Sequence, residues 1–279
     1  MERHQGHPQD DVAVDRIIGI TAHAGVSGPP AIRHRGAARL PLALRFAGVA
    51  ALALLGLGAA VDARAECPPV ESRPQARGDG SGRFYLGREI AHVMGHQGAD
   101  WLERPEREAE ERPDLALAGL NLKPADVVAD IGAGTGYYAL RIVRAVPRGR
   151  VLAVDVQPEM LARLRARLRE TGVRNVEPVL GTLRDPGLAP SSVDLVLMVD
   201  VYHEFSAPCE MLTAIVRALK PGGRVALLEY RAEDPAVPIR PSHKMSRAQA
   251  EREMAVAGLR LVKSVPGLPW QHLLVFEKR

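Results

Sequence analysis

The chain has 279 residues, enough for one domain of ordinary size with extensions, and its 46% hydrophobic and 25% charged residues indicate a globular protein. Aromatic residues make up only 4% of the chain, which argues against a base-stacking platform for nucleic acid. The net charge of +4 is a small excess, so nucleic acid is not expected among the partners.

Residues 1–39 have neither helical nor strand periodicity and are predicted to be a disordered leader. Residues 40–65 contain Arg45, an apolar run of 16 residues from Phe46 to Val61, and the small-x-small site Ala63-Arg64-Ala65. These are the three parts of a secretory signal peptide, so we expect cleavage after Ala65 and a periplasmic protein. An uncleaved anchor is the alternative, because such a run is marginal for spanning a bilayer. The protein is cytoplasmic if the segment is not an export signal.

Residues 66–80 are rich in Pro, Gly, Arg and Ser and are predicted to be a linker. They contain Cys67, and Cys209 is the second of the two cysteines. An exported protein could join the two in a disulfide, but the sequence leaves two free thiols equally open.

Residues 81–120 are predicted to form an N-terminal helical lid, with helices over about 87–95, 99–104 and 105–119. His92 and His96 lie four apart and would share a helix face, which is a metal-ligand spacing. Gly95 interrupts that helix and no third ligand follows at a readable spacing, so no metal is predicted.

The central motif of the chain is VVADIGAGTGYYAL, from Val127 to Leu140. The apolar start predicts a buried strand that ends at Asp130, and the residues after the glycines predict a helix. Between them stand Gly132, Gly134 and Gly136, where the backbone can turn sharply and approach a ligand. The spacing is not the G-x-G-x-x-G of a dinucleotide site.

Strands and helices alternate after this motif. Strands are predicted over about 150–155, 176–180, 194–199 and 224–229, followed by a last pair over 259–265 and 270–277. The second strand ends in Asp155, where a carboxylate can accept both hydroxyls of a ribose. The fourth is followed by Asp200 and His203, at the sheet end where ligands of parallel α/β folds bind.

The acid and glycine turn, Asp155, the segment after strand four and the turn Lys220-Pro221-Gly222-Gly223 occur in order over residues 121–279. Together they resemble the class I S-adenosylmethionine-dependent methyltransferases, in particular the small-molecule, type 11-like members. The resemblance implies a Rossmann-like α/β fold with strand order 3-2-1-4-5-7-6, strand 7 antiparallel and helices on both faces.

The resemblance also implies S-adenosylmethionine as cofactor. Its methionine part would lie at the glycine turn with Asp130, and its ribose at Asp155. Family members often carry Gly-Asp after strand three to bind adenine, whereas this chain has Gly181-Thr182. Thr182 is therefore assigned to the adenine, with Asp185 as a shifted acid, and Asp200 completes the cofactor residues.

The acceptor is expected to be a small molecule, because no separate target-recognition domain is evident. His203 is the candidate base for removing its proton, and the alternative is that His203 only shapes the pocket. Two other functions stay open: a non-catalytic envelope protein that binds S-adenosylmethionine or another adenosine compound, and a nicotinamide oxidoreductase, which the glycine spacing disfavours. The envelope alternative gains weight because S-adenosylmethionine is made in the cytoplasm, while residues 40–65 point outward. The sequence does not indicate an oligomeric state.

Overall fold

The computed structural model describes residues 67–74 and 78–278. The predicted leader and the predicted signal peptide or anchor lie outside the described residues, as do residues 66 and 75–77 of the predicted linker. Among the described residues, no helix has both the length and the apolar character needed to cross a membrane.

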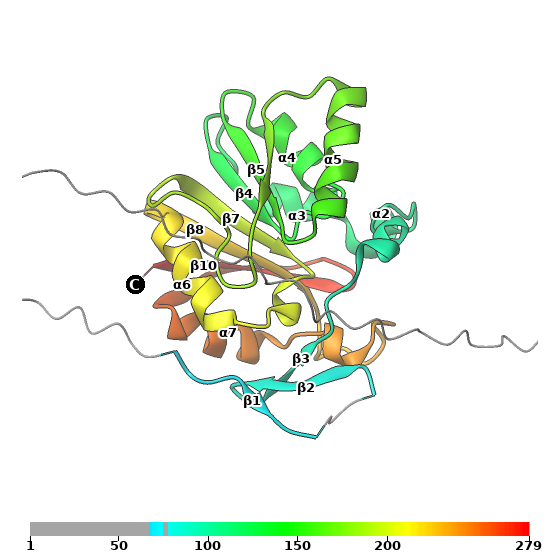
Figure 1. The fold of residues 1–279 in the computed structure, drawn as a ribbon, viewed down its shortest axis with the longest axis vertical. Helices are drawn as coiled ribbons and strands as arrows, with labels where there is room; N and C mark the ends of the chain where they lie inside the picture. Colours follow the sequence, from blue (N-terminus) through cyan, green and yellow to red (C-terminus); the bar gives the residue numbers. More distant parts are fainter. Residues whose placement is uncertain (1–66, 75–77, 279) are drawn as a thin grey trace, which may run out of the picture. The chain divides into compact units, whose positions relative to one another are not determined.

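A seven-stranded sheet in the order β6-β5-β4-β7-β8-β10-β9 forms the centre of the fold (Figure 1). Neighbours from β6 to β8 pair in parallel, whereas β10 pairs antiparallel with both β8 and β9. Numbered by occurrence, this is the order 3-2-1-4-5-7-6 with an antiparallel seventh strand, so the predicted sheet is confirmed. The strands are β4 (Val127–Ile131), β5 (Arg150–Asp155), β6 (Val176–Leu180), β7 (Val193–Val199), β8 (Leu219–Tyr230), β9 (Leu259–Val265) and β10 (Gln271–Lys278).

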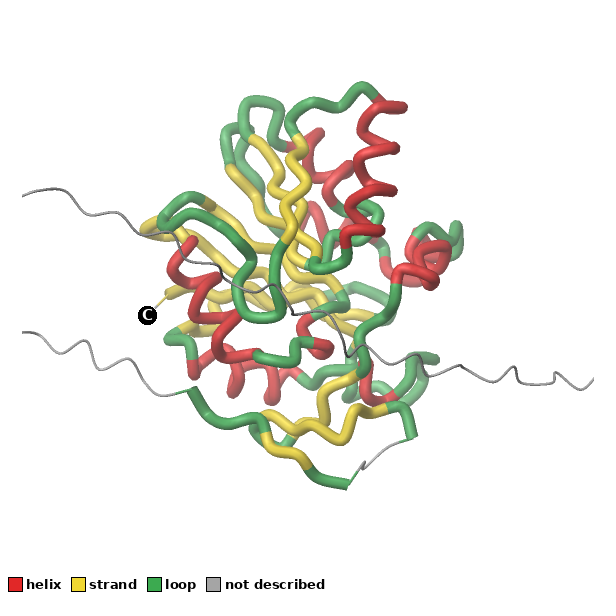
Figure 2. Tube along the Cα trace, in the orientation of Figure 1, coloured by secondary structure: helices red, strands yellow, loops and turns green. Residues whose placement is uncertain are grey.

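Helices cover both faces of this sheet, as Figure 2 shows. One apolar core joins the sheet to α3 (Pro113–Gly119), α4 (Ala139–Ala145) and α5 (Pro158–Thr171). A second core on the other face joins it to α6 (Pro208–Ala218) and α7 (Arg247–Val256). Because both faces are buried, strands such as VVADI and VDLVLMV are almost continuously apolar and do not alternate.

The helix predicted over 87–95 is wrong. A β-hairpin of β2 (Gly80–Tyr85) and β3 (Arg88–Ala91) stands there, and β1 (Glu71–Ser72) adds a third strand (Figure 1). Tyr85 pairs with Arg88, so the turn is the two residues Leu86 and Gly87, and both have positive φ, 47° and 88°. Such a turn matches the twist of a hairpin and ends any helix. His92 lies after β3 and outside any helix, so it shares no helical face with His96.

The rest of the predicted lid is helical, but in short pieces. The helix expected over 99–104 is α1 (Ala99–Leu102), and the one expected over 105–119 is divided into α2 (Arg107–Glu111) and α3. The break is at Arg112, which has a φ of 50° and precedes Pro113. A proline disfavours helical backbone in the residue before it, which accounts for the division.

Cys67 and Cys209 form a disulfide with a Cα–Cα distance of 5.6 Å. The bond ties the start of the predicted linker to the first turn of α6. Tyr85 and Ile90 of the hairpin are buried against Cys209, so the three-stranded sheet is packed beside α6 around this bond. The sequence left this pairing open, and the structure makes it.

Candidate functional site

A cavity of about 550 Å³ opens at the carboxyl ends of β4, β5, β7 and β8. Its walls come from the glycine turn after β4, the ends of β5 and β7, the lid helices α1 and α2, and the segment 238–243 after β8. This is the sheet edge at which parallel α/β folds bind ligands, and the volume is in the range of small-molecule and cofactor sites.

The glycine turn is fixed by backbone hydrogen bonds to the neighbouring strand. The amides of Gly132 and Ala133 donate to the carbonyl of Val154, at 2.8 and 2.9 Å. Gly132 and Gly134 have φ of 73° and 54°. A Cβ on Gly134 would lie 2.7 Å from Leu102 of the lid, and a Cβ on Gly132 would overlap Val201. Glycine is therefore required both for the turn and for the close approach of the walls.

The carboxylate of Asp155 is bound to the glycine turn by a backbone hydrogen bond. Its Oδ2 accepts from the amide of Gly134 and its Oδ1 from the amide of Gln157, each at 2.8 Å. Burial raises the pKa of Asp155, and these backbone N–H groups oppose the rise. Each oxygen keeps a second acceptor direction, so the carboxylate can still receive hydroxyl donors from the cavity.

Five of the residues predicted to hold the cofactor line the cavity, and two lie behind it. Those in the wall are Gly132, Gly134, Asp155, Thr182 and Asp200. Asp130 and Gly136 are not wall residues. Gly136 leaves room for Leu164 of α5. Asp130 is 2% exposed, and burial raises the pKa of its carboxyl to about 7.

Thr182 and Asp185 form a local turn after β6. The Thr182 hydroxyl accepts from the amide of Asp185 at 2.9 Å and donates to its carbonyl at 3.1 Å. The Asp185 carboxylate faces away from the cavity, toward the amide of Gly187 and the guanidinium of Arg217, each at 2.8 Å. Asp185 is not among the residues that line the cavity, and Thr182 is the polar side chain of this loop in the wall.

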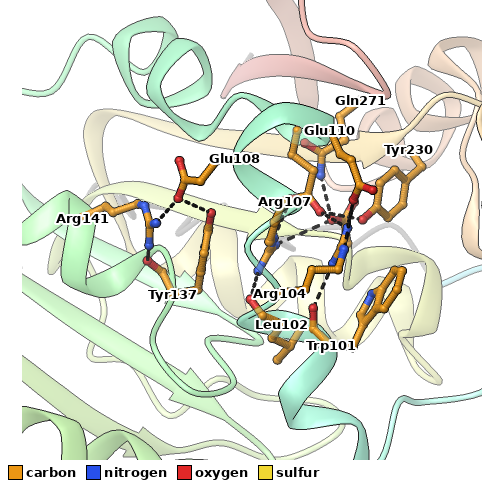
Figure 3. A network of polar contacts seen from close by, with 12 residues as sticks. Trp101, Leu102, Arg104, Arg107, Glu108, Glu110, Tyr137, Arg141, Tyr230 and Gln271 are labelled. Carbon is orange, nitrogen blue, oxygen red and sulfur yellow. Dashed lines mark hydrogen bonds and ion pairs between the residues drawn. The ribbon is translucent and has the colours of Figure 1, made fainter.

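A buried polar network joins the lid to the sheet at the far wall, and Figure 3 shows how its side chains converge. Glu111 of α2 accepts from Arg107 at 2.6 Å, from Arg104 at 2.9 Å and from the hydroxyl of Tyr230 at 2.8 Å. Burial opposes the charged form of Arg107, but Glu111 and Asp200 raise its pKa. The network fixes α2 over the ends of β7 and β8.

Asp200 extends this network into the cavity. Its Oδ2 accepts from the side-chain nitrogen Nε2 of Gln271 at 2.7 Å and lies 4.0 Å from the guanidinium of Arg107. Its buried Oδ1 has no hydrogen-bond partner in the structure, and burial raises the pKa of this carboxyl well above its usual value. Asp200 is also a wall residue of the cavity, and an acidic side chain there fits a ligand that brings a donor, such as an ammonium group.

The other end of the cavity is lined by His203, Glu204 and His243, and Glu229 is buried beside His203. His203 is 1% exposed; its Nδ1 lies 2.5 Å from Glu229 Oε2, and its Nε2 lies 3.0 Å from His243 Nδ1. Glu229 also accepts from the amides of Tyr202 and His203, at 3.0 and 3.3 Å. Burial lowers the pKa of both histidines to about 4 and raises the pKa of Glu204 to about 7. Burial also raises the pKa of Glu229, against Arg88 and the backbone amides.

The sequence singled out His203, which lines the cavity, but not its neighbours Glu229 and His243. Glu229 is the next-to-last residue of β8, and its parallel neighbour β7 leads into His203. The acidic residue at the end of this strand is the feature of the sequence from which a contact with His203 could have been predicted. His243 lies in a proline-rich insert after β8. Its position could not be predicted, because hydrophobic periodicity locates residues of helices and strands but not of loops.

The sheet order, the glycine turn and the acid at the end of β5 together define the class I methyltransferase fold. The residues present fit S-adenosylmethionine. Asp155 offers acceptors for the ribose hydroxyls, the glycine turn gives an approach without side chains, and Asp200 adds an acidic side chain to the wall that suits the ammonium group.

Comparisons with known proteins agree. Residues 128–223 match the family model of a methyltransferase domain. An uncharacterised methyltransferase of Mycobacterium bovis is 39% identical over 124 residues, which are 44% of this chain and 47% of that protein. A methyltransferase-like protein of Schizosaccharomyces pombe is 37% identical over 112 residues, 40% of this chain and 41% of that protein. The chain thus matches less than half the length of these relatives.

A similar solved structure is an S-adenosylmethionine-dependent methyltransferase from Aquifex aeolicus. It has a TM-score of 0.63 and 25% identity, over 66% of this chain and 98% of that one. Residues 128–223 belong to the methyltransferase-domain family, and the fold around them is that of the class I S-adenosylmethionine-dependent methyltransferases, whose cofactor is S-adenosylmethionine.

Proposed function

We propose that the protein transfers a methyl group from S-adenosylmethionine to a small, largely apolar acceptor that carries an oxygen, nitrogen or sulfur nucleophile. The observation that carries this proposal is the composition of one cavity: its walls include the cofactor residues Gly134, Asp155 and Asp200 together with the titratable side chains His203, Glu204 and His243. A protein that only binds the cofactor does not need titratable side chains such as His203, Glu204 and His243 beside the cofactor site.

The apolar class of the acceptor is supported by the mouth of the cavity. Val93, Trp101, Val156 and Leu183 line it and are 37–54% exposed. These are most of the large exposed apolar side chains among the described residues, and two more stand elsewhere on the surface. Exposed apolar groups gathered at a cavity favour an apolar ligand over a sugar or a nucleic acid.

S-adenosylmethionine supplies a methyl group made electrophilic by a sulfonium. The protein must hold the nucleophile in line, exclude water and receive a proton where the acceptor carries one. We propose that, when no metal ion is bound at this end of the cavity, His203 receives this proton through His243. The side chain of His243 is the more exposed of the two, 24% against 2%. Glu229 would orient the imidazole of His203 from the other side.

The test is methyl transfer from cofactor labelled in the methyl group. The purified protein is incubated with fractionated extract, and the labelled product is identified by mass spectrometry. We expect one labelled small molecule of apolar character, absent when the cofactor product S-adenosylhomocysteine is in excess. Binding of the cofactor without label in any fraction supports the non-catalytic alternative, and tight binding of NADH without binding of the cofactor contradicts the proposal.

We further propose that the protein is exported or held at the outer face of the membrane. The disulfide between Cys67 and Cys209 supports this, because such bonds persist mainly in oxidising compartments. Mass spectrometry of the chain from periplasmic, membrane and cytoplasmic fractions tests the proposal. A chain that begins at Glu66 and carries the disulfide is the expected form, whereas a longer, reduced chain in the cytoplasm contradicts it.

A further inference from the structure

Three atoms that commonly bind metals meet at the His203 end of the cavity. Nε2 of His203 lies 3.0 Å from Nδ1 of His243, and Oε1 of Glu204 lies 3.9 and 3.8 Å from these two nitrogens. In the part of the chain that the structure describes, this is the one group of three His, Cys, Asp or Glu side chains with such spacing. His92 and His96, the pair that the sequence suggested, do not belong to it.

The spacing is close to that of a coordination shell. Ligand atoms at about 2.1 Å from one ion, with angles of about 90–120° between them, lie about 3.0–3.6 Å apart. The two imidazole nitrogens already satisfy this at 3.0 Å. The Glu204 oxygen needs to approach by only about 0.3 Å. The same oxygen accepts from the amide of Met94 at 3.1 Å, and its second acceptor direction can serve the ion.

The surroundings orient both histidines for this task. Glu229 Oε2 lies 2.5 Å from Nδ1 of His203, the side opposite to the cluster. A carboxylate in that position holds the proton on Nδ1 and directs the Nε2 lone pair at an ion, as outer-shell carboxylates do in metal sites. The turn that carries His243 is fixed by its neighbour Ser242, whose amide and hydroxyl donate to Asp79 Oδ2 at 3.1 and 2.7 Å.

We infer that His203, Glu204 and His243 bind one divalent first-row transition-metal ion. Two imidazoles and one carboxylate are the donors that Zn²⁺ and Fe²⁺ take, whereas Ca²⁺ and Mg²⁺ prefer all-oxygen shells. All three side chains line the cavity, so the remaining coordination positions face the space where the acceptor is proposed to lie. The binding of the ion stands on its own geometry, and its role in catalysis rests on the function proposed above. There the ion would bind the acceptor's oxygen or sulfur and favour loss of its proton, with His203 acting as a ligand and not as a base.

The experiment uses the full chain without an affinity tag, dialysed against a chelator and then against metal-free buffer. Zn²⁺ is titrated by calorimetry, and Co²⁺ serves as a spectroscopic substitute with visible absorption bands. We expect a saturable site for one Zn²⁺ per chain that His243→Ala weakens at least 100-fold and Glu204→Gln at least 10-fold. Glu204→Gln keeps an oxygen acceptor for Met94. The matched control is His96→Ala, a partly exposed histidine outside the cluster, which should change the affinity less than 2-fold.

Two further measurements exclude a folding artefact. Zn²⁺ should raise the unfolding temperature of the unaltered chain and of His96→Ala, but not that of His243→Ala. All three proteins should bind S-adenosylhomocysteine equally, which shows that the cavity is intact. The inference is overturned if the unaltered chain binds no Zn²⁺ stoichiometrically, or if His243→Ala and Glu204→Gln bind it as well as the unaltered chain does. If the unaltered chain binds no Zn²⁺ but binds the cofactor and transfers methyl groups, only the metal site is wrong. Failure of the proposed function would appear instead as absence of cofactor binding or of methyl transfer in the unaltered chain.

Discussion

Asp155, at the end of β5, accepts a hydrogen bond from the amide of Gly134, in the turn after β4, at 2.8 Å. The other carboxylate oxygen accepts from the amide of Gln157. One side chain thus holds the glycine turn against the neighbouring strand and presents its remaining acceptor directions to the cavity. The residue predicted to bind the ribose also determines the shape of the turn that is predicted to approach the methionine part.

The first prediction is that Asp155→Asn weakens binding of S-adenosylmethionine as much as Asp155→Ala does, by about 1–3 kcal/mol. Both oxygens of Asp155 face backbone N–H groups. An asparagine must therefore turn its NH₂ group toward one of two donors, which disturbs Gly134 or Gln157. Calorimetry with the cofactor and its product measures the loss.

The control for this prediction is Asp185→Asn, an acid at the end of the adjacent strand whose carboxylate contacts Gly187 and Arg217 instead of the cavity. Its cofactor affinity should stay within about 2-fold. Unchanged affinity in Asp155→Asn would remove Asp155 from the site, and a large loss in Asp185→Asn would restore Asp185 as an adenine contact.

The second prediction concerns the pH dependence of stability at Asp130. Its folded pKa is about 7, whereas an unfolded aspartate has a pKa of about 3.9. The folded state therefore binds more protons between these values, so Asp130 makes the protein less stable as pH rises from about 4 to 7, with no further loss above 7. Asp130→Asn removes this penalty and should be more stable than the unaltered chain at pH 8, by about 1–3 kcal/mol.

Urea unfolding at pH 5 and pH 8 measures this difference, because the two proteins share every other titrating group. Asp100→Asn is the control for the substitution itself: its side chain is 98% exposed, so it should change the free energy of unfolding by less than about 0.5 kcal/mol. If Asp130→Asn is instead less stable than the unaltered chain at pH 8, and by more than at pH 5, the ionised carboxylate stabilises the fold through Arg107 and its pKa is not raised.

The sheet was predictable because its determinants are local in sequence. The buried strands are almost continuously apolar, Gly132, Gly134 and Gly136 mark the turn, and the order of motifs fixes the topology through the family resemblance. The start of α7 is local in the same way, because Ser246 accepts from the amide of Gln249, three residues further on. Each of these features depends on residues a few positions apart.

What sequence reasoning missed depends on residues that meet only after folding. The hairpin at 80–91 depends on a positive φ at Leu86. Leucine seldom adopts this conformation, so the sequence did not predict a turn there. His243 reaches His203 from 40 residues away, and Glu229 from 26. The disulfide closes a separation of 142 residues. Side-chain periodicity carries no information about contacts between residues so far apart in sequence. The sequence therefore did not predict which residues surround His203.

The third prediction is that the disulfide stabilises the protein by about 2–5 kcal/mol, because a long loop is closed in the unfolded chain. Cys67→Ser should therefore lower the midpoint of urea unfolding, and reductant should lower that of the unaltered chain to the same value. Reductant must leave the midpoint of Cys67→Ser unchanged, which controls for unrelated effects. Equal midpoints for oxidised and reduced protein would mean that the 67–91 segment unfolds apart from the main sheet.

The last prediction concerns the histidine pair and the transfer of the methyl group. Once an acceptor is known, His243→Ala should keep the affinity for S-adenosylmethionine within about 2-fold and lower turnover at least about 10²-fold. His203→Ala is the less informative change, because it leaves Glu229 buried without its imidazole partner and destabilises the site. Zinc then separates the two roles proposed for His203. If the pair binds a metal during catalysis, a chelator lowers turnover and Zn²⁺ restores it. If His203 acts only as a base, Zn²⁺ inhibits, because the ion occupies the Nε2 lone pair that must take the proton. Turnover that responds to neither zinc nor His243→Ala would assign catalysis to the placement of the acceptor alone.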